Sequence, residues 1–255
     1  MNINRMILTA LAVGALGASA QAAIVAMDSA ADGVYTGGNI HGLNGGFGFG
    51  PWTANPSTNG GTGGNFQFTS SQNGNGSSGN IDSSGRSWGA YANSGNTTTI
   101  SRAITASLGT PMTVWLDFDN GWIDNGSEVY ASIGSYQFGF TGGQSDYWYD
   151  LGTGRQSSGL GFTADGLRLK LVLNATGGYN FSATNLASNS VWASAQLFTG
   201  GNIPTFLSLT NVNAGGGSSN NAYINNMKVE AVPEPTTMLA LGLGLSAIAR
   251  RRKTK

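Results

Sequence analysis

Two aspartates separated by one residue are the side chains in this sequence best placed for chemistry. Asp117 and Asp119 lie where apolar and polar residues alternate, so a strand there puts both carboxylates on one face, about 6.6–6.8 Å apart. Two carboxylates at a set separation can hydrolyse a glycosidic bond, one as acid and the other as nucleophile or base. We expect instead that both lie on the solvated face of a half-buried strand. We therefore predict no catalytic residues and a protein that is not an enzyme.

The same stretch offers oxygen ligands for calcium. Asp117, Asp119 and Asp124 are the candidate ligands, because Ca²⁺ binds carboxylate and carbonyl oxygens. Residues 117–121 lack the spacing of an EF-hand loop and its closing glutamate. Calcium is therefore a candidate ligand, and the sequence requires no cofactor.

Other catalytic groups are scarce. The single histidine, His41, lies in a glycine-rich segment, and the chain has no G-x-S-x-G elbow, so a Ser-His-Asp triad is not indicated. The absence of cysteine excludes thiolate nucleophiles and thiolate metal sites. Glu128 and Glu230 are the only glutamates between residues 23 and 231. They form no Glu-x-Asp-x-Glu run, which would place three carboxylates on one face of a strand. A carbohydrate hydrolase is the least favoured function.

An aromatic cluster is the best candidate for binding sugars. It consists of three consecutive residues, Tyr147, Trp148 and Tyr149, between two aspartates. Because side chains alternate along a strand, Trp148 points away from its two neighbours, so one side can be exposed while the other packs. Burial of all three rings in the core is the alternative. Two tryptophans in predicted loops are weaker candidates: Trp52 and Trp122.

The elements that must position these residues are β-strands. Short runs rich in β-branched and aromatic residues recur every 8–12 residues or so, and no useful helical period occurs between residues 23 and 231. The predicted strands are 87–91, 97–104, 112–119, 128–133, 136–140, 146–150, 167–173, 179–184, 191–198, 205–209 and 222–229. This pattern predicts an all-β fold, an antiparallel sandwich or barrel. Residues 37–80 are expected to be loop-rich, with short strands.

Residues 1–22 have the pattern of a secretory signal peptide. Arg5 supplies the positive charge, residues 7–17 form an apolar segment expected to be helical, and residues 18–22 are small enough for cleavage. Cleavage after Ala22 is the first expectation, and cleavage after Ala20 is the alternative. We expect export through the Sec machinery.

The C-terminus predicts a second targeting signal. Four residues, Val232, Pro233, Glu234 and Pro235, precede an apolar run of 14 residues (236–249) and a basic cluster of Arg250, Arg251, Arg252 and Lys253. As a helix the run spans about 21 Å, against about 30 Å of hydrocarbon, so it crosses a membrane only with snorkelling or local thinning. Basic residues favour the cytoplasmic side, so the cluster acts as a membrane stop and the body lies outside.

This arrangement over residues 231–255 resembles the PEP-CTERM sorting signal. The resemblance rests on the Pro-Glu-Pro motif, the glycine-containing apolar run and the arginine-rich end, about a tenth of the chain. It implies a Gram-negative bacterium that makes extracellular polysaccharide, often in biofilms, and a membrane-embedded exosortase that cuts near the motif. The protein is then anchored transiently in the inner membrane before it reaches the cell surface or extracellular matrix.

Three further motifs resemble those of concanavalin A-like, laminin G-like jelly rolls. They are residues 85–93, 117–123 and 221–229, and the resemblance covers roughly residues 30–230. It implies a jelly-roll β-sandwich over residues 23–230, between an N-terminal signal helix and a single C-terminal hydrophobic helix. Calcium sites are common in jelly rolls of this kind.

The charge of the body limits its partners. Residues 23–231 carry six basic and eleven acidic residues, a net charge of −5, so they lack the basic surface that nucleic acid requires. We therefore expect a non-enzymatic protein of the envelope or extracellular matrix, processed by an exosortase and associated with exopolysaccharide. A lectin-like glycan-binding module is the alternative.

Overall fold

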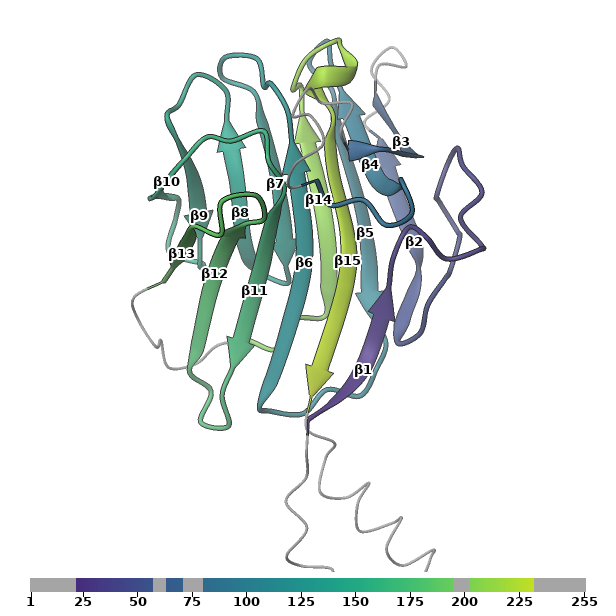
Figure 1. The fold of residues 1–255 in the computed structure, drawn as a ribbon, viewed down its shortest axis with the longest axis vertical. Helices are drawn as coiled ribbons and strands as arrows, with labels where there is room; N and C mark the ends of the chain where they lie inside the picture. The colour runs from purple at the N-terminus through teal and green to yellow at the C-terminus, as the bar shows by residue number, and fades with distance from the viewer. Residues whose placement is uncertain (1–21, 57–62, 71–79, 195–201, 232–255) are drawn as a thin grey trace, which may run out of the picture.

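The computed structural model describes residues 22–56, 63–70, 80–194 and 202–231, and these form two β-sheets that pack face to face (Figure 1). The first sheet has the order β13 (Val191–Ala193), β12 (Tyr179–Asn185), β11 (Leu167–Leu173), β6 (Met112–Asn120), β15 (Ala222–Ala231), β4 (Ser87–Ala92) and β3 (Gly63–Phe68), and β1 (Ala23–Asp28) also pairs with β15. The second has the order β10 (Gln156–Gly161), β9 (Asp146–Asp150), β8 (Tyr136–Thr141), β7 (Glu128–Ile133), β14 (Phe206–Val212), β5 (Thr97–Ile104) and β2 (Phe49–Pro56).

All pairings between these strands are antiparallel, which confirms the predicted all-β fold. The expected signal helix and C-terminal hydrophobic helix fall outside the described residues. Within the described part of the chain, no helical segment has the length and hydropathy that a membrane crossing needs.

The core forms where the apolar faces of the two sheets meet. In β6, Val114 and Leu116 are fully buried, and they lie opposite Leu171 and Leu169 of β11 in the same sheet. The second sheet supplies facing residues such as Phe138 of β8. Each buried side chain of this size contributes about 1.5–3 kcal/mol relative to an exposed one, so the alternating pattern fixes which face turns inward.

Most predicted strands are present at the expected positions, and four keep the predicted bounds: β5, β7, β9 and β11. Two strands were not predicted. β1 begins directly after the predicted signal peptide, and β10 reads Gln-Ser-Ser-Gly-Leu-Gly, which lacks the β-branched and aromatic residues that mark a strand. The segment predicted as loop-rich, 37–80, contains β2 and β3.

Strand β15 pairs with three neighbouring strands and contains a β-bulge. One of its edges pairs with β6 along most of its length, while the other pairs with β4 over Ala222–Ile224 and with β1 over Met227–Ala231. The register against β6 shifts between Asn225 and Lys228, and Asn226 has a positive φ of 48°. An extra residue in a strand bends it and increases its twist, so the bulge marks the point where β15 exchanges β4 for β1.

A buried arginine connects β1 to the second sheet. The Arg102 side chain on β5 is fully buried and forms an ion pair with Asp28 at the end of β1. Its Nε also donates to the carbonyl of Gly50 at 2.8 Å, and its Nη1 donates to the Tyr35 hydroxyl at 3.1 Å. Burial raises the pKa of Asp28, although the hydrogen bond from Tyr35 and the charge of Arg102 oppose that rise. The alternation of apolar and polar residues in the sequence did not indicate this buried cluster of Asp28, Tyr35 and Arg102.

Candidate functional site

Asp117 is held by three hydrogen bonds on the outer side of the first sheet. Arg168, its cross-strand neighbour on β11, donates from Nε to Oδ1 at 2.7 Å and from Nη2 to Oδ2 at 2.8 Å. Asn226 in the bulge of β15 adds a third donor at 2.9 Å to Oδ2. The carboxylate is only 1% exposed, so the expectation of a solvated position is wrong. Arg168 and Asn226 therefore already occupy both carboxylate oxygens of Asp117.

Asp119 is also only 1% exposed, and it lies opposite Tyr223 of β15 in the sheet register. Burial raises the pKa of Tyr223 to about 12, and the negative charges of Asp119 and Asp82 add to that rise. Burial also raises the pKa of Tyr147, again with a smaller contribution from Asp119. The strand thus turns both aspartates to one face, as predicted, but neighbouring side chains cover that face.

The three candidate calcium ligands do not form a metal site. Asp117 is bound by Arg168, and Asp124 is exposed in the segment after β6, where its Oδ1 lies 3.4 Å from Asn220 Nδ2. Within the described residues, no group of three or more His, Cys, Asp and Glu side chains is arranged to hold a metal ion.

The aromatic cluster on β9 is divided between the two faces of the second sheet, as the strand period predicts. Tyr147 is fully buried in the core, where its ring stacks on Phe138 at a centroid distance of 5.4 Å. Trp148 points outward but is only 7% exposed, because the Arg155 guanidinium lies 4.0 Å from the centre of its ring. Tyr149 is half-buried against Trp192. Tyr147 and Trp148 therefore have no free face on which a sugar could stack without displacing a neighbour.

The two weaker tryptophan candidates have opposite environments. Trp52 lies on β2, not in a loop, and is 1% exposed in the core beside Trp88. Trp122 is 65% exposed in the segment between β6 and β7, so it alone of the two could meet a ligand directly. His41 is exposed, and its Nδ1 accepts a hydrogen bond from the Ala54 amide at 3.1 Å.

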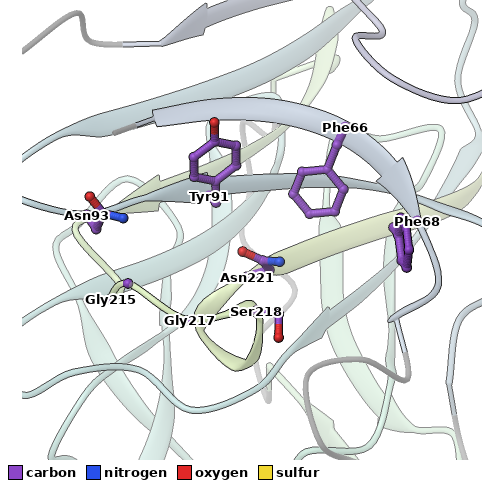
Figure 2. Close-up of a pocket in the computed structure, with 9 residues that line it drawn as sticks. Phe66, Phe68, Tyr91, Asn93, Gly215, Gly217, Ser218 and Asn221 are labelled. Carbon is purple, nitrogen blue, oxygen red and sulfur yellow. The ribbon is translucent and has the colours of Figure 1, made fainter. Parts of the chain in front are cut away.

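The structure contains a hollow of about 390 Å³ that sequence reasoning missed. It lies between the outer side of β3 and β4 and the segment that leads from β14 into β15 (Figure 2). Its lining combines aromatic rings, amide and hydroxyl groups and a glycine run: Phe66, Phe68, Tyr91, Asn93, Gly215, Gly216, Gly217, Ser218 and Asn221. These residues come from three distant stretches of the chain, so their spacing in the sequence gave no signal.

Two buried asparagines hold the glycine-rich side of the hollow. Asn220, the last residue of the short 3₁₀ helix η2 (Ser218–Asn220), donates from Nδ2 to the carbonyls of Trp122 at 2.9 Å and Ala214 at 2.8 Å. Its Oδ1 accepts from the Gly217 amide at 3.0 Å. Asn211 donates to the Asn220 carbonyl at 3.2 Å and accepts from the Ala214 amide at 3.1 Å. These bonds fix a segment that its three consecutive glycines would otherwise leave mobile.

The aromatic side is positioned by close packing. A Cβ at Gly89 would lie 2.6 Å from the Phe66 ring, so the glycine lets this ring approach the backbone of β4. Phe66 also makes an edge-on contact with Tyr223 at 5.6 Å. Phe68, two residues further along β3, is 49% exposed at one end of the hollow.

The predicted sorting residues, Val232 to Pro235 and Arg250 to Lys253, lie outside the described residues. The body ends at Ala231, the last residue of β15, which pairs with Ala23, the first residue of β1. The two chain ends of the body therefore leave from the same end of the sandwich (Figure 1).

Comparison with known proteins identifies the C-terminal segment. Residues 231–253 match the PEP-CTERM protein-sorting motif, so the chain carries the C-terminal sorting signal of an exported protein. No curated protein matches the sequence.

Among solved structures, the body is similar to arcelin-5, a lectin-like defence protein from Phaseolus vulgaris, with 6% identity and a TM-score of 0.43 over 76% of this chain and 97% of that one. It is similar to the catalytic domain of a GH131 beta-glucanase from Podospora anserina, with 12% identity and a TM-score of 0.39 over 56% and 72% of the two chains. It is also similar to a sialidase, with 13% identity and a TM-score of 0.36 over 54% of this chain, but it spans only 14% of that chain. Similarity at this level does not indicate an activity for this chain.

Proposed function

We propose that this protein is exported to the cell envelope or extracellular matrix, processed by an exosortase, and associated with extracellular polysaccharide without acting as an enzyme. The observation that carries the proposal is the position of the sorting motif. Its match begins at residue 231, and the last strand of the folded body ends at that residue. The motif therefore follows the body without an intervening linker.

The strand pairing supports a simple topology before processing. The expected signal peptide ends one residue before β1, and β1 pairs with β15 from Ala23↔Ala231 onward. Both targeting segments are thus attached to one end of the sandwich. In our proposal the protein leaves a Gram-negative cytoplasm through the Sec machinery, stays in the inner membrane through residues 236–249, and is released when the exosortase cuts near Pro233–Pro235. The folded body then extends away from the membrane.

A non-enzymatic role is favoured by the contacts of Asp117. Asp117, one member of the only acidic pair that the sequence offered for glycoside hydrolysis, is bound by Arg168 and Asn226. We assign the fold to the jelly-roll class as part of the same proposal. A lectin-like module remains the alternative function, and a carbohydrate hydrolase is less favoured.

The test is to follow the protein in an exosortase-bearing host. A variant with Pro233→Ala, Glu234→Gln and Pro235→Ala should stay at full length in the membrane fraction, whereas the wild type should appear outside the cells in a shortened form. A Thr236→Ala, Thr237→Ala variant, altered just beyond the motif, serves as the matched control. Normal release of the triple variant, or unchanged processing after deletion of the exosortase gene, would contradict the proposal.

A further inference from the structure

We propose that the hollow between Phe66, Tyr91 and the Gly215–Gly217 segment binds a neutral sugar residue of a polysaccharide chain. The inference rests on the association with polysaccharide proposed above, and it adds the site and the class of ligand. A volume of about 390 Å³ falls near the lower end of the range of small-molecule sites, about 300–1,000 Å³.

One side of the hollow is suited to the apolar face of a sugar ring. The rings of Phe66 and Tyr91 are half-buried and lie next to each other, with centroids 6.1 Å apart and planes 39° apart. Figure 2 shows both rings above the hollow and Phe68 at one end of it. The C–H groups of a pyranose face can pack on such rings as other apolar groups do, and Phe68, which is 49% exposed, gains the most from being covered.

The opposite side offers hydrogen bonds without charge. Asn93, Ser218 and Asn221 bring amide and hydroxyl groups to the hollow, and each of these groups can both donate and accept, as sugar hydroxyls also do. Gly215, Gly216 and Gly217 let a ligand approach the backbone closely. None of the nine residues that line the hollow is charged, so the lining favours a neutral sugar over a phosphate or a uronate.

The hydrogen-bonded framework beneath the hollow holds it ready for a ligand. Asn211 and Asn220 are 0% and 7% exposed, and together they bind the backbone on both sides of the glycine run. Asn220 also donates a hydrogen bond to the carbonyl of Trp122, a highly exposed residue in the segment next to the glycine run. A prearranged site loses less conformational entropy on binding than a mobile loop.

The hollow also lies where a polysaccharide outside the cell would meet it. Asn221 in the lining directly precedes β15, and the sorting motif begins at the other end of that strand. Ten residues of extended strand span about 33 Å, so the hollow is distant from the membrane-directed end.

The experiment uses the chain exported by a host without an exosortase, so that its C-terminal segment stays in place, and purified in detergent. Affinity electrophoresis through a neutral glucan, a galactomannan and an alginate-type uronate polymer identifies the ligand class, and calorimetry with oligosaccharides of any retaining polymer gives the affinity. We expect retention by at least one neutral polymer and not by the uronate polymer. Phe68→Ala should weaken binding about tenfold. Gly216→Trp should abolish it by filling the hollow, because a Cβ there has only Asn93 Nδ2 in reach, at 4.0 Å.

Phe47→Ala is the matched control, because Phe47 is also an exposed phenylalanine, at 53%, and lies outside the hollow. It should bind as the wild type does, and circular dichroism should show the same folded state in all three variants. Absence of retention by every neutral polymer, retention by the uronate polymer alone, or unchanged binding by both Phe68→Ala and Gly216→Trp would overturn the inference. Processing of the same variants is measured separately, so normal processing without sugar binding would refute the site and leave the sorting proposal standing.

Discussion

Ala23 of β1 and Ala231 of β15 are direct partners in an antiparallel pair, although 207 residues separate them in the sequence. The first residue after the expected signal peptide thus meets the residue at which the match to the sorting motif begins. β1 adds to the edge of β15 that β4 leaves uncovered, so the N-terminal strand needs the C-terminal strand in place before it can dock. In the Sec route proposed above, the first sheet is therefore completed only at the end of translocation.

This pairing can be tested with a disulfide, because the natural chain has no cysteine. Met27 and Lys228 are opposite each other in the β1–β15 pair, and opposite residues lie about 4.5–5.5 Å apart, within reach of a disulfide. We expect Met27→Cys, Lys228→Cys to cross-link on oxidation and to gain about 2–4 kcal/mol in free energy of unfolding. Non-reducing electrophoresis and mass spectrometry detect the bond. Met27→Cys, Lys170→Cys is the control, because Lys170 lies on β11 with β6 and β15 between; cross-linking of the control alone would refute the register.

The strands that could be predicted from the sequence are those whose two faces differ. Leu167 to Leu173 alternates between buried and outward residues, so period and propensity agree. β1 and β10 lack that contrast: five of the six residues of β1 are apolar (alanine, isoleucine, valine or methionine), and β10 is mostly serine and glycine. These strands form because an existing edge accepts them, which is information from the tertiary structure.

The Asp117–Arg168 pair should be a stabilising contact that depends on burial. Arg168→Met leaves a carboxylate that is 1% exposed with fewer donors, so we expect a loss of about 1–3 kcal/mol in free energy of unfolding. Adding Asp117→Asn removes the buried charge and should recover part of that loss. Urea denaturation measures both. Lys170→Met, two residues along the same strand, should change stability by less than about 0.5 kcal/mol. Equal losses in the single and double variants would contradict this account.

Trp148 should act as a packing residue. Its ring is covered by Arg155 and contacts Tyr130, and its Nε1 donates to Thr141 Oγ1 at 3.0 Å. Trp148→Ala removes a large buried side chain and should lower the free energy of unfolding by about 3–5 kcal/mol, while protein that remains folded should keep its affinity for any sugar ligand. Denaturation and calorimetry separate the two effects. Loss of binding at unchanged stability would instead restore the sequence-based hypothesis for Tyr147, Trp148 and Tyr149.

Stability should fall at alkaline pH because of Tyr147. Burial raises the pKa of this residue above its ordinary value of 10.0. Above pH 10 an unfolded chain therefore loses this proton while the folded chain keeps it, and stability decreases by up to about 1.4 kcal/mol per pH unit for this residue. Tyr147→Phe should be less stable at pH 7, because it loses the contacts with Asn120 and Thr163, but its stability should depend less steeply on pH above 10. An unchanged slope would contradict the prediction.

The contacts in the candidate site join residues that are distant in the sequence, and these contacts could not be predicted from it. Spacing placed Asp117 and Asp119 on one face correctly, yet it gave no indication that Arg168 and the bulge residue Asn226 cover one of them. The hollow combines Phe66 and Phe68, Tyr91 and Asn93, and residues 215–221, which meet only because β15 lies beside β4. The sorting signal could be recognised because its parts are contiguous.

Whether the C-terminal segment is a cleaved sorting signal is decided by the intact mass of the mature protein recovered outside the cells of an exosortase-bearing host. We expect a single chain that begins at Ala23, or at Gln21 if the alternative cleavage site is used, and that ends within or next to residues 232–235. A recovered chain whose mass still includes residues 236–255 would show that the C-terminal segment is not a cleaved sorting signal, and it would contradict the account.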